Sequence, residues 1–188
     1  MMKILIIKSS PRPHGNSSTL ADQLAEGALQ AGAQVECISL HKLNIHPCNG
    51  CDACVKTGKC TTKDDMQPLF DKLIEADAIV LASPIYWFTY SAQLKICIDR
   101  WYSIWKNDHD AFRGKPFGII LTYGDTDLYN SGAINAIHTF ETMLNFLRAK
   151  IAGWVYGSLN DVGDAQKNPE LMQKAYQLGV KMVNGSVN

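Results

Sequence analysis

Five short apolar segments alternate along the chain with longer stretches in which apolar residues recur every three or four positions. The short segments are rich in Ile, Leu, Val and Ala, and they comprise residues 3–9, 35–40, 78–82, 117–123 and 151–156. Three of them, residues 3–9, 78–82 and 117–123, are near-continuous apolar runs, which are typical of strands that are covered on both faces. The stretches with helical spacing are residues 18–31, 66–74, 94–105, 137–147 and 171–182. The alternation predicts parallel strands joined by helical crossovers.

The predicted fold class is α/β. Five parallel strands favour the flavodoxin-like doubly wound sheet, with strand order 2-1-3-4-5 and helices on both faces in three layers, α/β/α. The chain has 188 residues, and one domain holds roughly 150. We therefore expect a single domain over residues 1–188, with a Cys-rich insertion at about 45–62.

Composition narrows the possible partners. Apolar residues make up 46% of the chain and charged residues 19%, which suits a packed globule. Lys plus Arg and Asp plus Glu each number 18, so no net charge attracts nucleic acid or an anionic membrane. No apolar run approaches the roughly 18 residues of a membrane span, and the opening segment is too short for a signal peptide. We expect a cytoplasmic protein without nucleic-acid or membrane partners.

Ligands of doubly wound sheets bind beyond the carboxyl ends of the strands, where the strand order reverses. The loop after the first predicted strand is rich in hydroxyl groups, carries Arg12, and leads into a helix that Ser17 or Ser18 can cap. A helix N-terminus attracts anions, so this loop is a candidate phosphate site. The loop contains neither a Walker motif nor GxGxxG. Ordinary helix capping beside a solvated Arg12 is the open alternative.

Two further loops are expected at the same edge. Residues 83–91 contain Tyr86, Trp87, Phe88 and Tyr90, and so many aromatic side chains cannot all turn inward from one short loop. Some of them are available to contact a planar ligand or a partner chain. The loop that begins at Thr122 offers Gly124, where a backbone can approach a ligand closely.

These motifs resemble a known family. Residues 9–12 and 15–17, then 83–87 with 91–95 and 98–100, are similar to motifs of the flavodoxin-like NAD(P)H-dependent FMN reductase family. With the Cys-rich segment, the chain resembles more narrowly the iron-sulfur flavoprotein branch. The resemblance implies a non-covalent FMN that carries the chemistry itself, so no catalytic side chain is assigned. It places the phosphate on Ser10, Arg12, Asn16, Ser17 and Ser18, the ring against Pro84, Ile85, Tyr86, Trp87 and Phe88, and the remaining ring edge along Thr122, Tyr123 and Gly124.

Four cysteines lie within the insertion, Cys48, Cys51, Cys54 and Cys60, spaced C-x2-C-x2-C-x5-C. The first three share the spacing of the bacterial ferredoxin motif, and soft thiolate ligands favour an iron-sulfur cluster over hard cations. The hypothesis is a [4Fe-4S] site, which the iron-sulfur flavoprotein resemblance also implies. A zinc site, a disulfide pair and reduced thiols remain open alternatives.

Outside the insertion, the neighbouring charged residues Asp99 and Arg100 are expected to form a solvated ion pair or a subunit contact.

The resemblance implies an FMN-dependent oxidoreductase that passes electrons from NAD(P)H or ferredoxin to a quinone, a flavin or another small acceptor. The alternative is a non-catalytic, flavodoxin-like electron carrier, and a third hypothesis is a ligand-sensing or structural module. Aromatic residues exceed what a small core requires, so we expect a homodimer or homotetramer with the flavin near the interface. These residues are Trp87, Phe88, Tyr90, Trp101, Tyr102 and Trp105.

Overall fold

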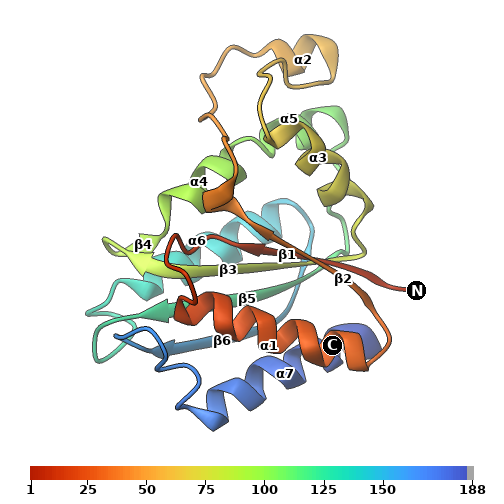
Figure 1. Ribbon diagram of the computed structural model, residues 1–188. Helices are drawn as coiled ribbons and strands as arrows, with labels where there is room; N and C mark the ends of the chain where they lie inside the picture. The colour runs from red at the N-terminus through yellow and green to blue at the C-terminus, as the bar shows by residue number, and fades with distance from the viewer. Residues whose placement is uncertain (186–188) are drawn as a thin grey trace.

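The computed structural model, which describes residues 1–185, places five parallel strands in one sheet with helices on both faces (Figure 1). The parallel strands are β1 (Lys3–Lys8), β2 (Gln34–Ser39), β3 (Ala78–Tyr86), β5 (Pro116–Tyr123) and β6 (Lys150–Ser158). Their order is β2-β1-β3-β5-β6, which is 2-1-3-4-5 when only the parallel strands are counted. The predicted flavodoxin-like order is confirmed. A two-residue strand, β4 (Thr89–Tyr90), pairs antiparallel with β3 and was not predicted.

Alternation along the strands separates two hydrophobic cores. Ile4 and Ile6 of β1 face the helices α1 (Asn16–Gln30) and α7 (Pro169–Asn184). Leu5 and Ile7 point to the opposite face, because successive side chains of a strand alternate in direction. That face is covered by α3 (Met66–Glu75), α4 (Ala92–Asp99), α5 (Tyr102–Asn107) and α6 (Ala133–Phe146). Both faces of the central strands β1, β3 and β5 are therefore buried, as the apolar runs predicted, whereas the edge strand β2 is partly exposed.

Two helix boundaries differ from the prediction. Helix α1 begins at Asn16 with Gly15 as its N-cap, so the expectation of a Ser17 or Ser18 cap was wrong. The Thr19 N–H already donates to the Gly15 carbonyl at 3.0 Å, which places both serines inside the first turn. The predicted helix over 94–105 is two helices, α4 and α5. Between them the Arg100 N–H bonds to the Cys97 carbonyl, an i to i−3 pattern that tightens the chain.

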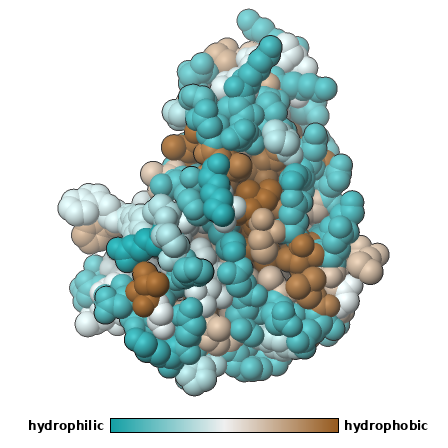
Figure 2. All heavy atoms as spheres, in the orientation of Figure 1, coloured by the Kyte–Doolittle hydropathy of each residue, from teal (hydrophilic) through white to brown (hydrophobic). Residues whose placement is uncertain are grey.

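The Cys-rich insertion extends away from the sheet. It lies between the short 3-10 helix η1 (Leu40–Lys42) and α3, and it contains the one-turn helix α2 (Ala53–Thr57) at the top of Figure 1. The face shown in Figure 2 is mostly hydrophilic, with an apolar area that follows the edge strand β2 below this projection. Within residues 1–185, the structure contains no helix that combines the length and apolar character required to span a membrane.

Candidate functional site

A cavity of about 300 Å³ opens at the carboxyl ends of β1, β3, β5 and β6. Its volume lies at the lower end of the range for small-molecule sites. The structure brings most of the predicted FMN residues together in its wall, while Ser18, Trp87 and Phe88 lie outside it. The lining residues are Ser10, Arg12, Gly15, Asn16, Ser17, Pro84, Ile85, Tyr86, Thr122, Tyr123, Gly124, Leu159, Asn160 and Val162.

The N-terminus of α1 forms one end of this cavity. Ser17 is 1% exposed, and its hydroxyl has no hydrogen-bond partner among the described residues. The first turn of α1 carries no acidic side chain, so its N–H groups and the helix dipole favour an anion. Ser10 packs closely against the backbone of Gly15, since a Cβ at Gly15 would collide with the Ser10 hydroxyl oxygen. Arg12 is exposed at the same end.

Asn16 connects this helix end to the loop after β6. Its side-chain Nδ2 donates to the Asp161 carbonyl at 2.9 Å, and its Oδ1 accepts from the Ala165 N–H at 3.1 Å. Asn16 is buried and lines the cavity, yet both ends of its amide are engaged by the loop. Asn16 therefore connects the N-terminus of α1 to the loop after β6.

The opposite end of the cavity is built from the ends of β3 and β5. Strand β3 continues through Ser83 and Pro84 to Tyr86, four residues beyond the predicted end at Ala82. Tyr86 and Tyr123 therefore project from the ends of strands that lie side by side in the sheet. Burial raises the pKa of Tyr123, with smaller contributions from Tyr156 and Asp127, so its hydroxyl remains protonated at neutral pH.

Buried serine hydroxyls connect the loops beneath the cavity. The Ser91 hydroxyl donates to the Ser9 hydroxyl at 2.8 Å, and the Ser9 hydroxyl donates to the Ala82 carbonyl. The Ser83 hydroxyl accepts from the Ser91 N–H at 3.0 Å. All three serines are fully buried, so this network fixes the loop after β1 relative to the loop after β3. Sequence reasoning missed it because hydroxyl-rich loops carry no signal for which hydroxyls meet.

Trp87 and Phe88 form the tip of the β3–β4 hairpin. Both have positive φ angles, 49° and 70°, a strained conformation for bulky side chains. Trp87 is 91% exposed. The tip is held against α6, where the Asn135 side chain donates to the Phe88 carbonyl at 3.1 Å.

Trp87 and Phe88 line a second cavity of about 210 Å³. Ile85, Tyr123 and Gly124 line both this cavity and the first, so the two adjoin. The segment predicted to contact the ring is thus divided between two neighbouring cavities.

Two of the aromatic residues expected to exceed the needs of the core do belong to it. Tyr90 and Trp101 are buried there and are not available to a partner chain.

A fourth loop, after β6, was missed. Leu159, Asn160 and Val162 complete the wall of the first cavity. Asn160 lies against Gly124, where an added Cβ would come within 2.8 Å of its Oδ1 atom. The loop contains no recognisable motif. Its position at the carboxyl end of a parallel strand was the available signal.

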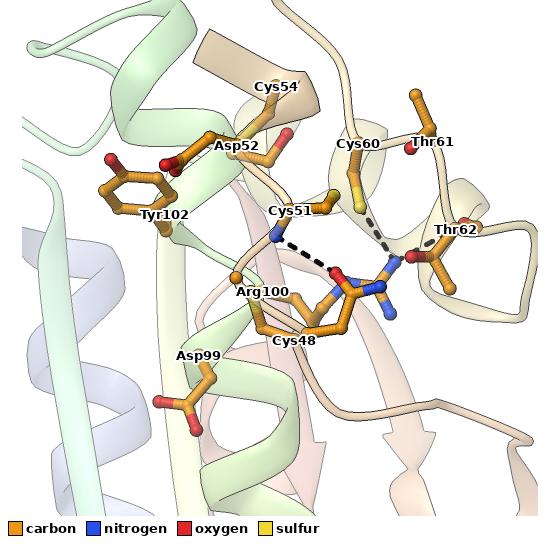
Figure 3. Close-up of a pocket in the computed structure, with 13 residues that line it drawn as sticks. Cys48, Cys51, Asp52, Cys54, Cys60, Thr61, Thr62, Asp99, Arg100 and Tyr102 are labelled. Atoms are coloured by element: carbon orange, nitrogen blue, oxygen red, sulfur yellow. Dashed lines mark hydrogen bonds between the residues drawn. The ribbon is translucent and has the colours of Figure 1, made fainter.

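The four cysteines occupy a separate place, in the projecting insertion. Cys48, Cys51, Cys54 and Cys60 line a cavity of about 40 Å³ with Arg100 at its base (Figure 3). In this view Cys60 is turned toward the guanidinium. Residues 1–185 contain no group of three or more His, Cys, Asp or Glu side chains placed to hold a metal ion. The thiols fit a cluster in type and number, but the structure does not gather them at ligating distance.

Arg100 is buried, so the expectation of a solvated Asp99–Arg100 pair was wrong. Its Nη1 lies 2.7 Å from Asp64 Oδ2, and the two side chains are 1% and 0% exposed. Burial raises the pKa of Asp64. Hydrogen bonds from Arg100 and from the His46 and Met66 N–H groups together lower it by more, so the pKa of Asp64 lies below its ordinary value. Asp99 instead pairs at the surface with Lys95.

Comparison with known proteins identifies the family. The sequence pattern of the NADPH-dependent FMN reductase family matches residues 2–163. The chain belongs to this family. The resemblance drawn from the two loop motifs is therefore confirmed.

Two relatives illustrate the place of this chain in the family. An iron-sulfur flavoprotein of Methanocaldococcus jannaschii is 41% identical over 99 residues, which cover 53% of this chain and 51% of the relative. The match thus spans about half the length of that relative. A protein of Bacillus subtilis, provisionally named an NAD(P)H-dependent FMN-containing oxidoreductase, is 29% identical over 182 residues, covering 94% of this chain and 96% of that protein.

Solved structures agree on the fold. The NAD(P)H:quinone oxidoreductase of Methanothermobacter marburgensis superposes with a TM-score of 0.71 over 96% of each chain, at 18% sequence identity. At this identity the likeness concerns the fold alone.

The residues of the cavity at the N-terminus of α1 fit an FMN. The unpartnered Ser17 hydroxyl, the first-turn N–H groups of α1 and the Arg12 cation suit a phosphate. Tyr86 and Tyr123 at the other end of the same cavity offer aromatic surface to a ring system.

Proposed function

We propose that this chain is an FMN-dependent oxidoreductase that takes electrons from NAD(P)H or ferredoxin and delivers them to a quinone, a flavin or another small acceptor. One observation carries the proposal: the buried, unpartnered Ser17 hydroxyl lies at the N-terminus of α1, in the same cavity as the ends of β3 and β5. An anion site and an aromatic-lined site at one sheet edge suit a ligand with a phosphate at one end and a planar ring at the other.

Within this proposal the side chains bind and orient. Ser10, Arg12 and Ser17 hold the phosphate, assisted by the α1 dipole. The backbone from Pro84 to Tyr86 and from Thr122 to Gly124 flanks the ring. The bound FMN supplies the hydride and electron chemistry, which none of the lining side chains provides. The adjoining cavity beside Trp87 and Phe88 has room for a donor or acceptor next to the ring.

The test begins with the cofactor. Apoprotein prepared without flavin is titrated with FMN, and quenching of flavin fluorescence gives the dissociation constant. We expect 1:1 binding, and binding weakened at least tenfold in Arg12→Ala. Protein that takes up no FMN when FMN is offered in excess contradicts the proposal.

Turnover then distinguishes an enzyme from a carrier. Steady-state oxidation of NADH or NADPH with a quinone supports the oxidoreductase. Reduction that stops after one equivalent per flavin supports the flavodoxin-like carrier, the second candidate. Carriers commonly dock through a charged face, and the zero net charge of this chain favours the enzyme. The cytoplasmic location stays a prediction.

A [4Fe-4S] centre on Cys48, Cys51, Cys54 and Cys60 is a finer part of the proposal. It is supported by the type and number of thiols around one cavity and requires the loop to draw them closer. Iron and acid-labile sulfide, measured per FMN after anaerobic purification, test it. Four of each per FMN are expected, and their absence contradicts this part alone.

We also propose that the protein is a homodimer or homotetramer. Trp87 and Phe88 are 91% and 54% exposed at the hairpin tip, and a second copy would cover them beside the flavin cavity. Sedimentation measurements on the wild type and on Trp87→Ser test this. A wild-type monomer at high concentration contradicts the proposal.

A further inference from the structure

The cysteine loop, defined here as residues 47–62, is closed at its base. The chain enters it after His46 and leaves it before Asp64, and the His46 N–H donates to Asp64 Oδ2 at 2.9 Å. Next to this contact the Asn44 N–H donates to Asp65 Oδ2 at 2.6 Å, and the Asp65 N–H returns a bond to the Asn44 carbonyl. All four cysteines that line the small cavity belong to this loop.

Arg100 lies inside the base of the loop and contacts both of its ends. Its Nη1 donates to the His46 carbonyl at 2.9 Å, where the loop begins. Its Nη2 donates to the Thr62 carbonyl at 3.4 Å, where the loop ends. The same Nη2 lies 3.2 Å from the Cys60 sulfur (Figure 3). One buried side chain, from the junction between α4 and α5, therefore contacts both ends of the loop and one thiol.

The charge of this guanidinium is balanced locally. Asp64 accepts from Nη1 at 2.7 Å and from Nη2 at 3.3 Å, a two-pronged contact that suits the planar arginine fork. A buried ion pair contributes little net stability compared with apolar residues of the same size. The role of Arg100 here is to fix geometry, because the planar guanidinium directs its N–H groups at the carbonyl, carboxylate and sulfur partners of the loop at the same time. A lysine ammonium, which is a flexible point charge, cannot reproduce that arrangement.

We propose that Arg100 is the positioning residue of the cysteine loop: its guanidinium, balanced by Asp64, joins the two ends of the loop and orients the Cys60 sulfur. For the part that concerns iron and sulfide, the inference rests on the proposed function. For the loop itself it stands on the contacts described. When the cluster is bound, the guanidinium is also a charged hydrogen-bond donor to one ligand sulfur, a contact that tunes cluster potentials.

Hydrogen exchange tests the loop part directly. Deuterium uptake of peptides covering residues 44–66 is compared between wild type and Arg100→Lys, both as purified with FMN bound. We expect exchange at least tenfold faster in the variant, with β1 and β5 unchanged. The matched control is Arg113→Lys, the same substitution in an exposed pair with Asp110, and it should leave the loop unchanged. Uptake in Arg100→Lys equal to that of the wild type overturns the proposal.

Cluster content and potential test the second part. In Arg100→Lys we expect iron and sulfide per FMN to fall several-fold while FMN content stays constant. In the remaining cluster, loss of the donor to sulfur should lower the equilibrium constant for one-electron reduction about tenfold, a shift of about 59 mV to more negative potential. Wild-type iron content together with a wild-type potential overturns this part.

Two outcomes separate this inference from the proposed function. If the wild type carries FMN but no iron, the cluster fails as a proposal, and hydrogen exchange alone decides the placement of Arg100. If Arg100→Lys does not fold, the paired variant Arg100→Met with Asp64→Leu removes both charges together, which buried pairs commonly tolerate. Faster exchange of residues 44–66 in that variant supports the proposal, and unchanged exchange refutes it.

Discussion

The backbone of Gly179 in α7 packs directly against the carbonyl group of Leu24 in α1, so that a Cβ at position 179 would collide with the Leu24 oxygen. Gly27 of α1 stands in the same relation to the backbone of Tyr176. The two helices thus meet through glycines on the face of the sheet that carries α1. Because the N-terminus of α1 lines the cavity proposed for FMN, this close packing helps to fix where the proposed phosphate site lies.

The first prediction concerns this contact. Gly179→Ala should lower the free energy of unfolding by about 1–3 kcal/mol, because overpacking outweighs the helix propensity gained by alanine. Urea denaturation monitored by far-UV circular dichroism measures the change. Gln177→Ala, on the exposed side of the same helix, should alter stability by less than about 0.5 kcal/mol. Equal stabilities of the two variants would show that the helices separate at little cost.

The second prediction separates binding from stability at Ser17. Ser17→Ala should weaken FMN binding about tenfold, since the hydroxyl is a donor placed at the proposed phosphate site. The stability of the apoprotein should stay the same or rise slightly, because the buried hydroxyl has no partner to lose. Fluorescence titration and thermal unfolding without FMN measure the two effects. Ser18→Ala, outside the cavity, should have a smaller effect on affinity, and an effect equal to that of Ser17→Ala would contradict the geometry.

The third prediction concerns Asn16. Asn16→Ala leaves the Asp161 carbonyl and the Ala165 N–H without their partner, so the free energy of unfolding should fall by about 1–3 kcal/mol. FMN binding should weaken as well, since the loop after β6 forms part of the cavity wall. Gln166→Ala removes an exposed contact to Thr19 and serves as the control. A variant that keeps wild-type stability would show that the loop is held elsewhere.

The fourth prediction concerns acid stability at Asp64. Its native pKa lies below the ordinary value of 3.8, so its ionised form stabilises the native state above that pH. This contribution is lost as pH falls from 3.8 through the lowered native pKa. Asp64→Asn should cost about 3 kcal/mol near neutral pH and should flatten the decline in stability below pH 4.

Denaturation curves from pH 2 to pH 7 measure the Asp64 effect. Asp110→Asn, which disturbs an exposed pair with Arg113, should change the curves much less. If the free energy of unfolding of Asp64→Asn falls below pH 4 as steeply as that of the wild type, the pH dependence belongs to other carboxyl groups.

Much of the fold follows from local pattern. Ile4 to Ile7 are apolar in succession and bury on alternate faces of the sheet, so a doubly covered parallel strand was readable directly. The carboxyl ends of such strands form one edge, which is why residues as distant in sequence as Arg12, Tyr86 and Tyr123 could be assigned to one site. The loop at Asn160 escaped notice because its chemistry is ordinary and its place depends on the last strand.

The sequence by itself determined the layered α/β sandwich, the sheet edge at which the cavity proposed for FMN opens and the spacing of the four cysteines, since each depends on periodicity or on short motifs. The tertiary structure decided which polar groups meet: that Arg100 is buried against Asp64 and Cys60, that Asn16 is engaged by the loop after β6, and that Ser17 is left without a partner. These contacts join segments far apart in sequence. Burial and hydrogen-bond geometry set them, and neither is encoded in the spacing of residues along the chain.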